Sequence, residues 1–157
     1  MKTIFHLMAA LAAGGSIFMS FIVAPVAFSR FPKELAGDIT GSLFPAYFTM
    51  QIVCGVILLL ILCAGRIPSN QWKKFALVLA LTLVLCAGIN LGVVTPQARE
   101  YRKDENRREE FRAAHRTSMI LNLVAVLTAV GTVIVSPKLF VPVPGDGRKQ
   151  GDEQSAS

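Results

Sequence analysis

The run FALVLALTLVLCAGINLGVV, residues 75–94, decides the fold class, because it contains no charged side chain. A helix of this length rises about 30 Å, which matches the thickness of the hydrocarbon core of a bilayer. Three other uncharged runs lie between Lys2 and Arg30, between Asp38 and Arg66, and between Arg116 and Lys138. A helix of a soluble bundle would carry a polar stripe, and these runs have none. The pattern therefore predicts four membrane crossings.

We predict an all-α integral membrane four-helix bundle over residues 1–136, with a solvated, charged helical connection between the third and fourth helices. The period-two alternation of a membrane barrel is absent, so helices are the remaining way to satisfy the backbone in lipid. The expected spans are residues 4–29, 44–64, 72–94 and 117–136. The first span continues past Ala12, so we expect it not to be cleaved. Residues 137–157 are rich in Pro, Gly and charge and are predicted to be a disordered tail.

Charge is confined to the connections and the ends of the 157-residue chain, whose formal net charge is +6. Membrane proteins keep their basic residues in these places. We therefore predict a cell-membrane location, the lipid bilayer as the surroundings, and no nucleic-acid partner. In the third connection, Glu100 with Lys103 and Glu109 with Arg112 have the spacing of stabilising helical pairs. Thr95 is expected to be the N-cap of this helix.

Small residues at i, i+4 spacing mark faces where helices approach closely in lipid. Three spans carry such a face, which favours a compact bundle or, alternatively, a homo- or hetero-oligomer assembled through one of these faces. The faces are Ala12, Ser16, Ser20 and Ala24 in the first span, Ala80, Val84, Gly88 and Gly92 in the third, and Ser118, Asn122, Ala125, Ala129 and Thr132 in the fourth.

Polar residues of three spans fall at similar depth, near the side of the membrane opposite both termini. Polar groups inside lipid usually face the bundle interior and form hydrogen bonds. Two interpretations follow: a polar clamp between helices, or the floor of a ligand pocket open to that side. The predicted cluster is Tyr47, Gln51, Asn90, His115, Ser118 and Asn122.

No pattern of catalytic or metal-binding residues is present in the sequence. His6 and His115 belong to opposite sides, so they cannot together ligate one haem. Cys54, Cys63 and Cys86 have no zinc or redox spacing and are interpreted as free thiols. We predict no catalytic residue, metal site or cofactor, and a non-enzymatic component that binds, assists transport or assembles with partners. The alternative is a haem- or metal-binding membrane oxidoreductase or carrier.

Three short motifs resemble the transmembrane protein 205-like family, which is catalogued as a domain of unknown function. They are Pro25 with Phe28, the run Leu43-Phe44-Pro45-x-Tyr47-Phe48, and His115-x-x-Ser118-x-x-x-Asn122-Leu123. The resemblance implies a four-span membrane protein and supplies no catalytic residues. This chain departs from the family at Arg116, where the family often has Gly. The chain is also similar, more distantly, to the copper resistance D group, some of whose members bind haem or metal.

Overall fold

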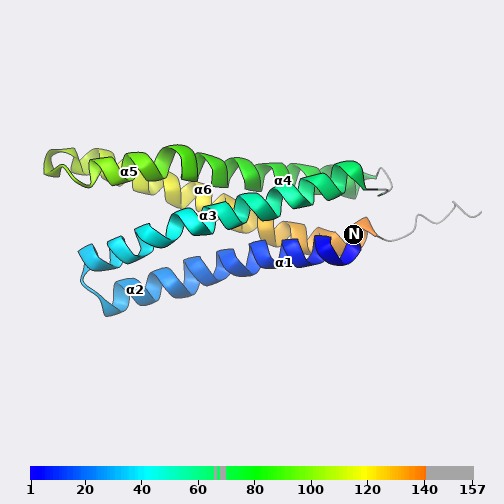
Figure 1. Ribbon diagram of the computed structural model, residues 1–157, viewed down its shortest axis with the longest axis horizontal. Helices are drawn as coiled ribbons and strands as arrows, with labels where there is room; N and C mark the ends of the chain where they lie inside the picture. The colour runs from blue at the N-terminus through cyan, green and yellow to red at the C-terminus, as the bar shows by residue number, and fades with distance from the viewer. Residues whose placement is uncertain (66, 68–69, 141–157) are drawn as a thin grey trace, which may run out of the picture.

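The computed structural model describes residues 1–65, 67 and 70–140, and within these residues it contains four long helical rods and no strand (Figure 1). The first rod comprises α1 (Lys2–Phe18), the π-helical turn η1 (Met19–Val23) and α2 (Ala24–Arg30). The second is α3 (Lys33–Ala64). The third comprises α4 (Gln71–Ile89), the π-helical turn η2 (Asn90–Val94) and α5 (Thr95–Tyr101). The short 3₁₀ turn η3 (Glu105–Arg107) leads into the fourth rod, α6 (Arg108–Leu139). The predicted all-α bundle is confirmed.

The rods pack as a closed bundle in which α1 contacts α3 and α6, and α4 contacts the same two helices. The start of α1 and the end of α6 lie at one end, where the rings of Phe5 and Phe140 are 5.7 Å apart. The opposite end, which we call the charged end, carries the α2–α3 turn and the helical turn between α5 and α6 (Figure 1). Successive rods therefore run in opposite directions.

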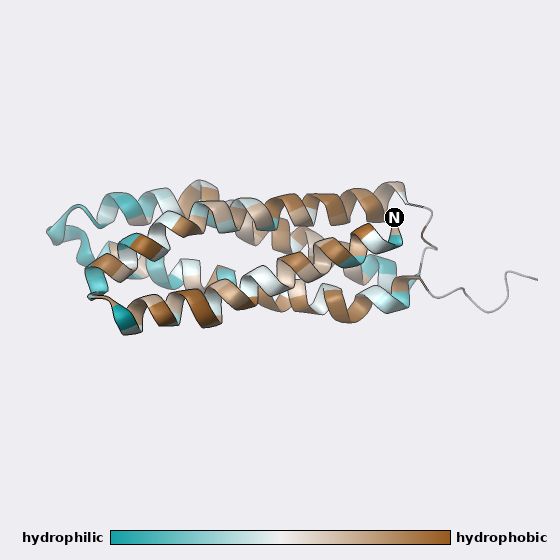
Figure 2. Cartoon of the chain, turned by 60° about the horizontal axis from the view of Figure 1, so that its bottom comes forward, coloured by the Kyte–Doolittle hydropathy of each residue, from teal (hydrophilic) through white to brown (hydrophobic). Residues whose placement is uncertain are grey.

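The outside of the bundle is more apolar than a soluble protein would allow. Leu7, Leu60, Val78 and Leu127 expose 59–62% of their surface, and each lies within one of the long apolar helices. Hydrophobic colouring covers the middle of the rods, and hydrophilic colouring gathers at the charged end (Figure 2). All four rods are long and apolar enough to cross a bilayer. The chain is a multi-pass membrane protein.

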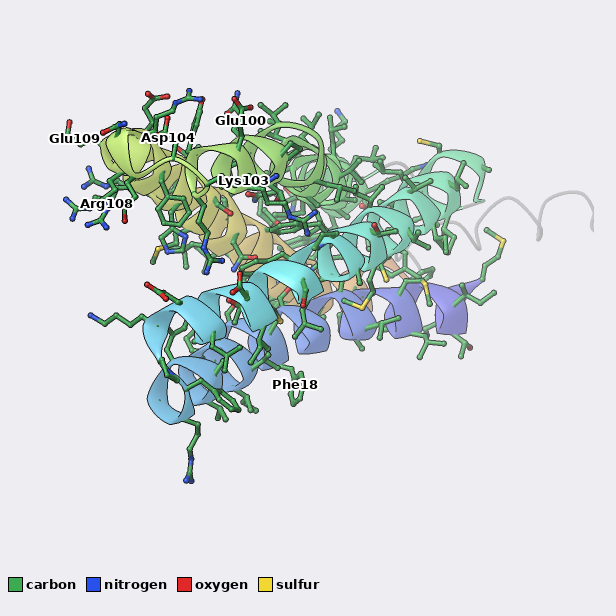
Figure 3. The ribbon with its side chains drawn as sticks, turned by 60° about the vertical axis from the view of Figure 1, so that its left-hand side comes forward. Phe18, Glu100, Lys103, Asp104, Arg108 and Glu109 are labelled. Carbon is green, nitrogen blue, oxygen red and sulfur yellow. The ribbon has the colours of Figure 1, made fainter. Side chains whose placement is uncertain are left out.

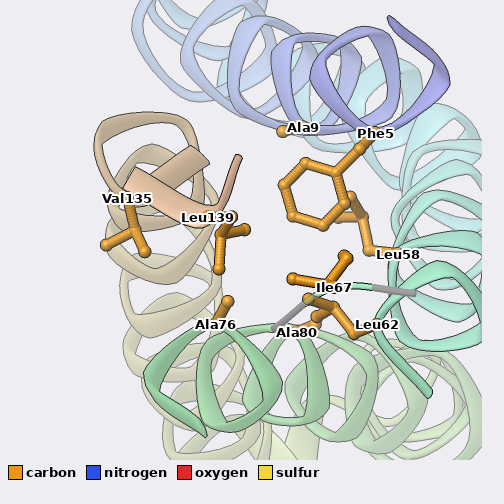
Figure 4. Packing of buried hydrophobic residues seen from close by; sticks show 9 residues of the cluster. All are labelled: Phe5, Ala9, Leu58, Leu62, Ile67, Ala76, Ala80, Val135 and Leu139. Atoms are coloured by element: carbon orange, nitrogen blue, oxygen red, sulfur yellow. The ribbon is translucent and has the colours of Figure 1, made fainter. Parts of the chain in front are cut away.

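A dry cluster closes the bundle at the end that carries the N-terminus (Figure 4). Phe5, Leu58, Leu62 and Leu139 are fully buried in it, and they pack against the small side chains of α4. Small residues let the backbones approach, which is how helices gain packing energy in lipid.

Each π-helical turn ends two residues before a proline. Proline has no backbone N–H, and its ring collides with the carbonyl group four residues earlier. A π-helical turn widens the helix locally and absorbs this conflict. Pro25 follows η1, and Pro96 follows η2. Thr95 is therefore not an N-cap: its φ of −63° and ψ of −46° are helical, because η2 carries the rod through the proline.

Several helix ends differ from the expected connections. α3 begins at Lys33 instead of near residue 44, since a helix can continue beyond the bilayer, and Phe31 and Pro32 make the turn before it. At the other end of the chain, α6 includes residues 137–139, and Leu139 is buried. Residues 141–157, the rest of the predicted tail, lie outside the described residues.

The charged connection is helical, as expected, but it consists of the extended ends of two rods. Arg107 forms ion pairs with Glu100 and Glu110, and Arg108 pairs with Glu105. The predicted pairs of Glu100 with Lys103 and of Glu109 with Arg112 do not form in the part of the chain described. The turn after Tyr101 interrupts the helical spacing on which the first of these pairs depended.

Two of the three small-residue faces lie toward the interior. Ser16, Ala125 and Thr132 are buried within them. The face in the third rod is different, because a Cβ added at Gly88 or Gly92 would meet nothing within 4 Å. Steps of four residues advance by 400°, so a long i, i+4 series drifts around the helix. The buried face instead steps by three and four residues, through Ala76, Ala80, Leu83, Ala87, Asn90 and Val94.

Candidate functional site

A hydrogen-bonded chain of side chains joins three rods near the charged end. The hydroxyl of Tyr47 on α3 donates to Oδ1 of Asn122 on α6 at 2.8 Å. Nδ2 of Asn122 donates in turn to Oγ of Ser20 in η1 at 3.0 Å. Each such bond between membrane helices contributes about 0.6 kcal/mol. Asn122 therefore fixes the spacing of the first, second and fourth rods at this depth.

Gln51 extends the chain toward the centre of the bundle. It lies one helical turn from Tyr47 and donates from Nε2 to the Tyr47 hydroxyl at 3.1 Å. The same nitrogen donates to the hydroxyl of Ser16, and it lies 3.3 Å from the carbonyl oxygen of Ala12. Gln51 and Ser16 are completely buried. These contacts attach α3 to α1 without any charged group.

Asn90 opens η2 and is also completely buried, yet neither of its amide atoms has a hydrogen-bond partner among the described residues. Oε1 of Gln51 is also buried and has no hydrogen-bond partner among the described residues. An unpartnered buried amide costs about 1–3 kcal/mol. Asn90 is therefore an interior polar group outside the hydrogen-bonded chain.

A cavity of about 750 Å³ lies between the first rod and α6, toward the charged end. Asn122, Ser20 and Val126 belong to its lining at the level of the hydrogen-bonded chain. Its walls are mostly apolar and come from both π-helical turns, α2, α3, α5 and α6. The conflict between proline and helix described above thus shapes two of these walls. π-helical turns frequently occur at functional sites.

Part of the lining of this cavity reaches the apolar outer surface of the bundle. Four aromatic or aliphatic side chains of its lining expose between 48% and 65% of their surface, namely Phe21, Phe28, Met119 and Leu123. α2 packs mainly on α3, whereas α5 packs on α6. The cavity separates these two pairs.

A second cavity, of about 830 Å³, lies at the charged end beneath the turn between α5 and α6. Its lining is mostly polar and charged, and several of its residues project from the bundle end in Figure 3, including Lys103, Asp104 and Arg108. Arg102 joins α5 to α3 here, through an ion pair with Asp38 at 2.8 Å and a bond to the carbonyl oxygen of Glu34 at 2.7 Å.

The structure places the six predicted cluster residues in three environments. Tyr47, Gln51 and Asn122 belong to one hydrogen-bonded chain, and Asn90 is buried without a partner. Ser118 is half-buried in the wall of the apolar cavity. His115 also borders the cavity but is exposed, and its ring stacks on Phe111 with centroids 6.1 Å apart.

The residues of the three family-like motifs also fall into different environments. Four of them line the apolar cavity: Pro25, Phe28, Phe44 and Leu123. Phe48 is buried behind the wall, where its ring stacks on Phe44 at 5.6 Å. Leu43 and Pro45 are not part of the lining; Pro45 lies inside α3, and Leu43 is 42% exposed.

Sequence reasoning missed two kinds of site residue. Ser16 and Ser20 were interpreted only as small packing residues, although a serine hydroxyl can also bond to a neighbouring helix. Gly37, Thr40 and Gly41 were assigned to a connection, yet they form a cavity-lining face of α3. The i, i+3, i+4 spacing of these three residues was the available signal.

Within the described residues, no three His, Cys, Asp or Glu side chains come close enough to hold a metal ion. Nδ1 of His6 lies 2.7 Å from the carbonyl oxygen of Lys2, at the end opposite to His115. Cys54 and Cys86 are buried free thiols, and Cys63 is an exposed one. His115 is thus the one histidine in the cavity walls.

Comparison with known proteins identifies the family. Residues 7–107 match the model of a domain of unknown function, DUF4149. The chain belongs to this family. An uncharacterized protein of Aquifex aeolicus (strain VF5) is 29% identical over 119 residues, which cover 75% of this chain and 83% of that relative. No solved structure matches the chain significantly.

The DUF4149 match covers the first three rods and ends at η3, before α6. It includes Tyr47, Gln51 and Asn90 and leaves Asn122 outside. Membership confirms the expectation of a family of unknown function. The family description names no activity.

Proposed function

We propose that the protein is a non-enzymatic membrane component that binds an amphiphilic molecule taken from the bilayer. The observation that carries the proposal is the apolar cavity of about 750 Å³, with polar groups at Asn122 and Ser20 and part of its lining at the apolar outer surface of the bundle. Ligand sites are typically concave, mostly apolar, and equipped with a few polar groups that fix orientation. The location we propose is the cell membrane.

The hydrogen-bonded chain serves this proposal in two ways. The bond from Tyr47 to Asn122 holds α3 and α6 together at the deep end of the cavity. Ser118, one helical turn before Asn122, leaves its hydroxyl without a protein partner in the described part of the chain and borders the cavity. A bound molecule would thus meet a rigid floor that carries hydroxyl and amide groups. The clamp and the pocket are then parts of one site.

Gly41 offers a direct test of cavity binding. It lies on the cavity-lining face of α3, and a Cβ added there meets nothing within 4 Å. Gly41→Leu should fill the cavity while the helix is retained. Gly88→Leu is the matched control, because Gly88 is equally unobstructed but lines neither cavity.

The measurement is mass spectrometry of small molecules retained after gentle solubilisation. We expect the wild-type chain and Gly88→Leu to retain a bound amphiphile and Gly41→Leu to lose most of it. Equal retention by all three proteins would contradict the proposal. A Soret band in the purified protein would instead favour the haem-binding alternative. The resemblance to the transmembrane protein 205-like family is compatible with a role in membrane traffic or export, and it names no ligand.

A further inference from the structure

We infer that the bound amphiphile is a phospholipid, with its phosphate in the charged cavity and an acyl chain in the apolar one. This inference rests on the proposed function and specifies the ligand of the same site. The two cavities are adjacent, because they share six lining residues: Glu34, Gly37, Gly41, Arg99, Arg102 and Phe111. A single molecule with a polar head and an apolar tail would place its head in the charged cavity and its tail in the apolar one.

The charges of the polar cavity favour an anionic head. Its lining holds five cations, Arg99, Arg102, Lys103, Arg108 and Arg112, against four anions, Glu34, Asp38, Asp104 and Glu105. Two of the cations are already used, since Arg102 pairs with Asp38 and Arg108 pairs with Glu105. Lys33 adds a further cation in the wall of the apolar cavity.

Two arginines stand at the right place to receive a phosphate. Arg99 uses Nη2 to donate to the carbonyl oxygen of Gly41 at 3.1 Å, and it forms no ion pair within the described residues. Arg112, on α6, belongs to the same lining and likewise has no ion pair within the described residues. Arginine matches phosphate well because its planar guanidinium donates several hydrogen bonds at once. Phe111 lies beside both cavities, at the point where the head would join the tail.

The depth of the site selects a lipid rather than a free phosphate ion. Arg99 follows the third predicted span, so the charged cavity lies at the level of the lipid headgroups. A free phosphate would occupy only the charged cavity and would leave the apolar one unexplained. A phospholipid entering between α2 and α6 would occupy both without leaving the bilayer.

The experiment compares two lipids with identical acyl chains, phosphatidylglycerol and the uncharged diacylglycerol, offered as an equimolar mixture to the purified full chain. Retained lipid is counted by native mass spectrometry. We expect the wild-type chain to prefer phosphatidylglycerol by about tenfold, which is the effect of one or two charge-assisted hydrogen bonds. Glycerol phosphate at the same concentration should not displace the lipid, because it has no acyl chain.

Charge variants test the headgroup contact. Arg99→Gln combined with Arg112→Gln should abolish the preference while diacylglycerol is still retained. Arg99→Lys combined with Arg112→Lys should restore part of it. Arg116→Gln is the control, since Arg116 is exposed and lines neither cavity.

The outcomes separate the two proposals. An unchanged preference in the double glutamine variant, or equal displacement by glycerol phosphate, would overturn the phospholipid assignment. If Gly41→Leu still reduces lipid retention in that case, binding in the cavity stands and only the headgroup inference fails. If Gly41→Leu retains both lipids like the wild-type chain, the proposed function itself fails.

Discussion

The hydroxyl of Tyr47 lies 2.8 Å from Oδ1 of Asn122 and joins α3 to α6 across 75 positions of sequence. The same hydroxyl accepts a bond from Gln51, and the same amide donates to Ser20. One tyrosine and one asparagine thus connect the buried centre of the bundle with the floor of the cavity. The stability of the bundle and the shape of the cavity depend on the same contact.

Tyr47→Phe removes two hydrogen bonds and keeps the ring. We expect a loss of about 1 kcal/mol in the free energy of unfolding, because the bond to Asn122 between α3 and α6 contributes about 0.6 kcal/mol and the buried Gln51 amide also loses an acceptor within α3. Thermal unfolding in detergent measures the change. Tyr101→Phe is the control, since the Tyr101 hydroxyl has no hydrogen bond within the described residues and its ring contacts Arg107. Equal losses in both variants would contradict the assigned role of the Tyr47 hydroxyl.

The two interior asparagines should respond oppositely to replacement by leucine. Asn122→Leu breaks bonds to Tyr47 and Ser20, so it should lower the unfolding temperature. Asn90→Leu removes an amide that has no partner, so it should leave the unfolding temperature unchanged or raise it. Thermal unfolding of both variants under the same conditions provides the comparison. A larger loss of stability in Asn90→Leu than in Asn122→Leu would contradict this expectation. It would mean that the Asn90 amide is hydrogen-bonded to a group other than the described side chains.

The turn between α5 and α6 should depend on pH. The Arg107 guanidinium lowers the pKa of the Glu110 carboxyl, chiefly through a hydrogen bond to it. A carboxyl whose pKa is lower in the folded state stabilises that state above its ordinary pKa, and the contribution is lost as the pH falls through the lowered value. NMR titration of glutamate side-chain carbons should give Glu110 a higher midpoint in Arg107→Gln than in the wild-type chain. Arg116→Gln should not move it, and an unmoved midpoint in Arg107→Gln would contradict the ion pair.

The arrangement of the rods predicts that both termini lie on the same side of the membrane. The start of α1 and the end of α6 meet at one end of the bundle, where Lys2 lies 5.8 Å from the ring centre of Phe140. Reporter fusions at the N- and C-termini should therefore report the same compartment. A cysteine introduced at residue 103, in the turn at the charged end, should be labelled from the other side. Fusions that report opposite compartments would contradict a four-span topology.

The sequence predicted the class of fold because the uncharged runs are long and unbroken. It also placed Tyr47, Gln51 and Asn122 at one depth, since span boundaries and antiparallel order determine depth. It could not predict that the third rod stays helical through Pro96, because the π-helical turn η2 that precedes this proline leaves no mark in hydrophobicity. The extension of α3 to Lys33 was missed for a related reason: charged and small residues at the end of a long helix have the composition of a connection.

The cavity itself could not be predicted from the sequence. It depends on how far apart the helices stand in space, which the pattern of apolar residues along each helix does not specify. The GxxxG step of Gly88 and Gly92 was likewise predicted to be a contact face, yet a Cβ added at either glycine would meet nothing within 4 Å. Small residues indicate where helices can approach closely, and only the rotation of each rod decides whether they do so inside the bundle.

Photochemical labelling shows directly whether a membrane amphiphile occupies the apolar cavity. The chain is reconstituted with phosphatidylglycerol that carries a photoreactive group on one acyl chain, irradiated, and mapped by peptide mass spectrometry. We expect adducts concentrated on cavity-lining residues such as Phe28, Ser118 and Leu123, and we expect these adducts to be lost in Gly41→Leu but not in Gly88→Leu. Phe18 points away from the bundle and should serve as the lipid-facing reference (Figure 3). Adducts spread evenly over Phe18 and the cavity residues, and unchanged by Gly41→Leu, would contradict occupation of the cavity.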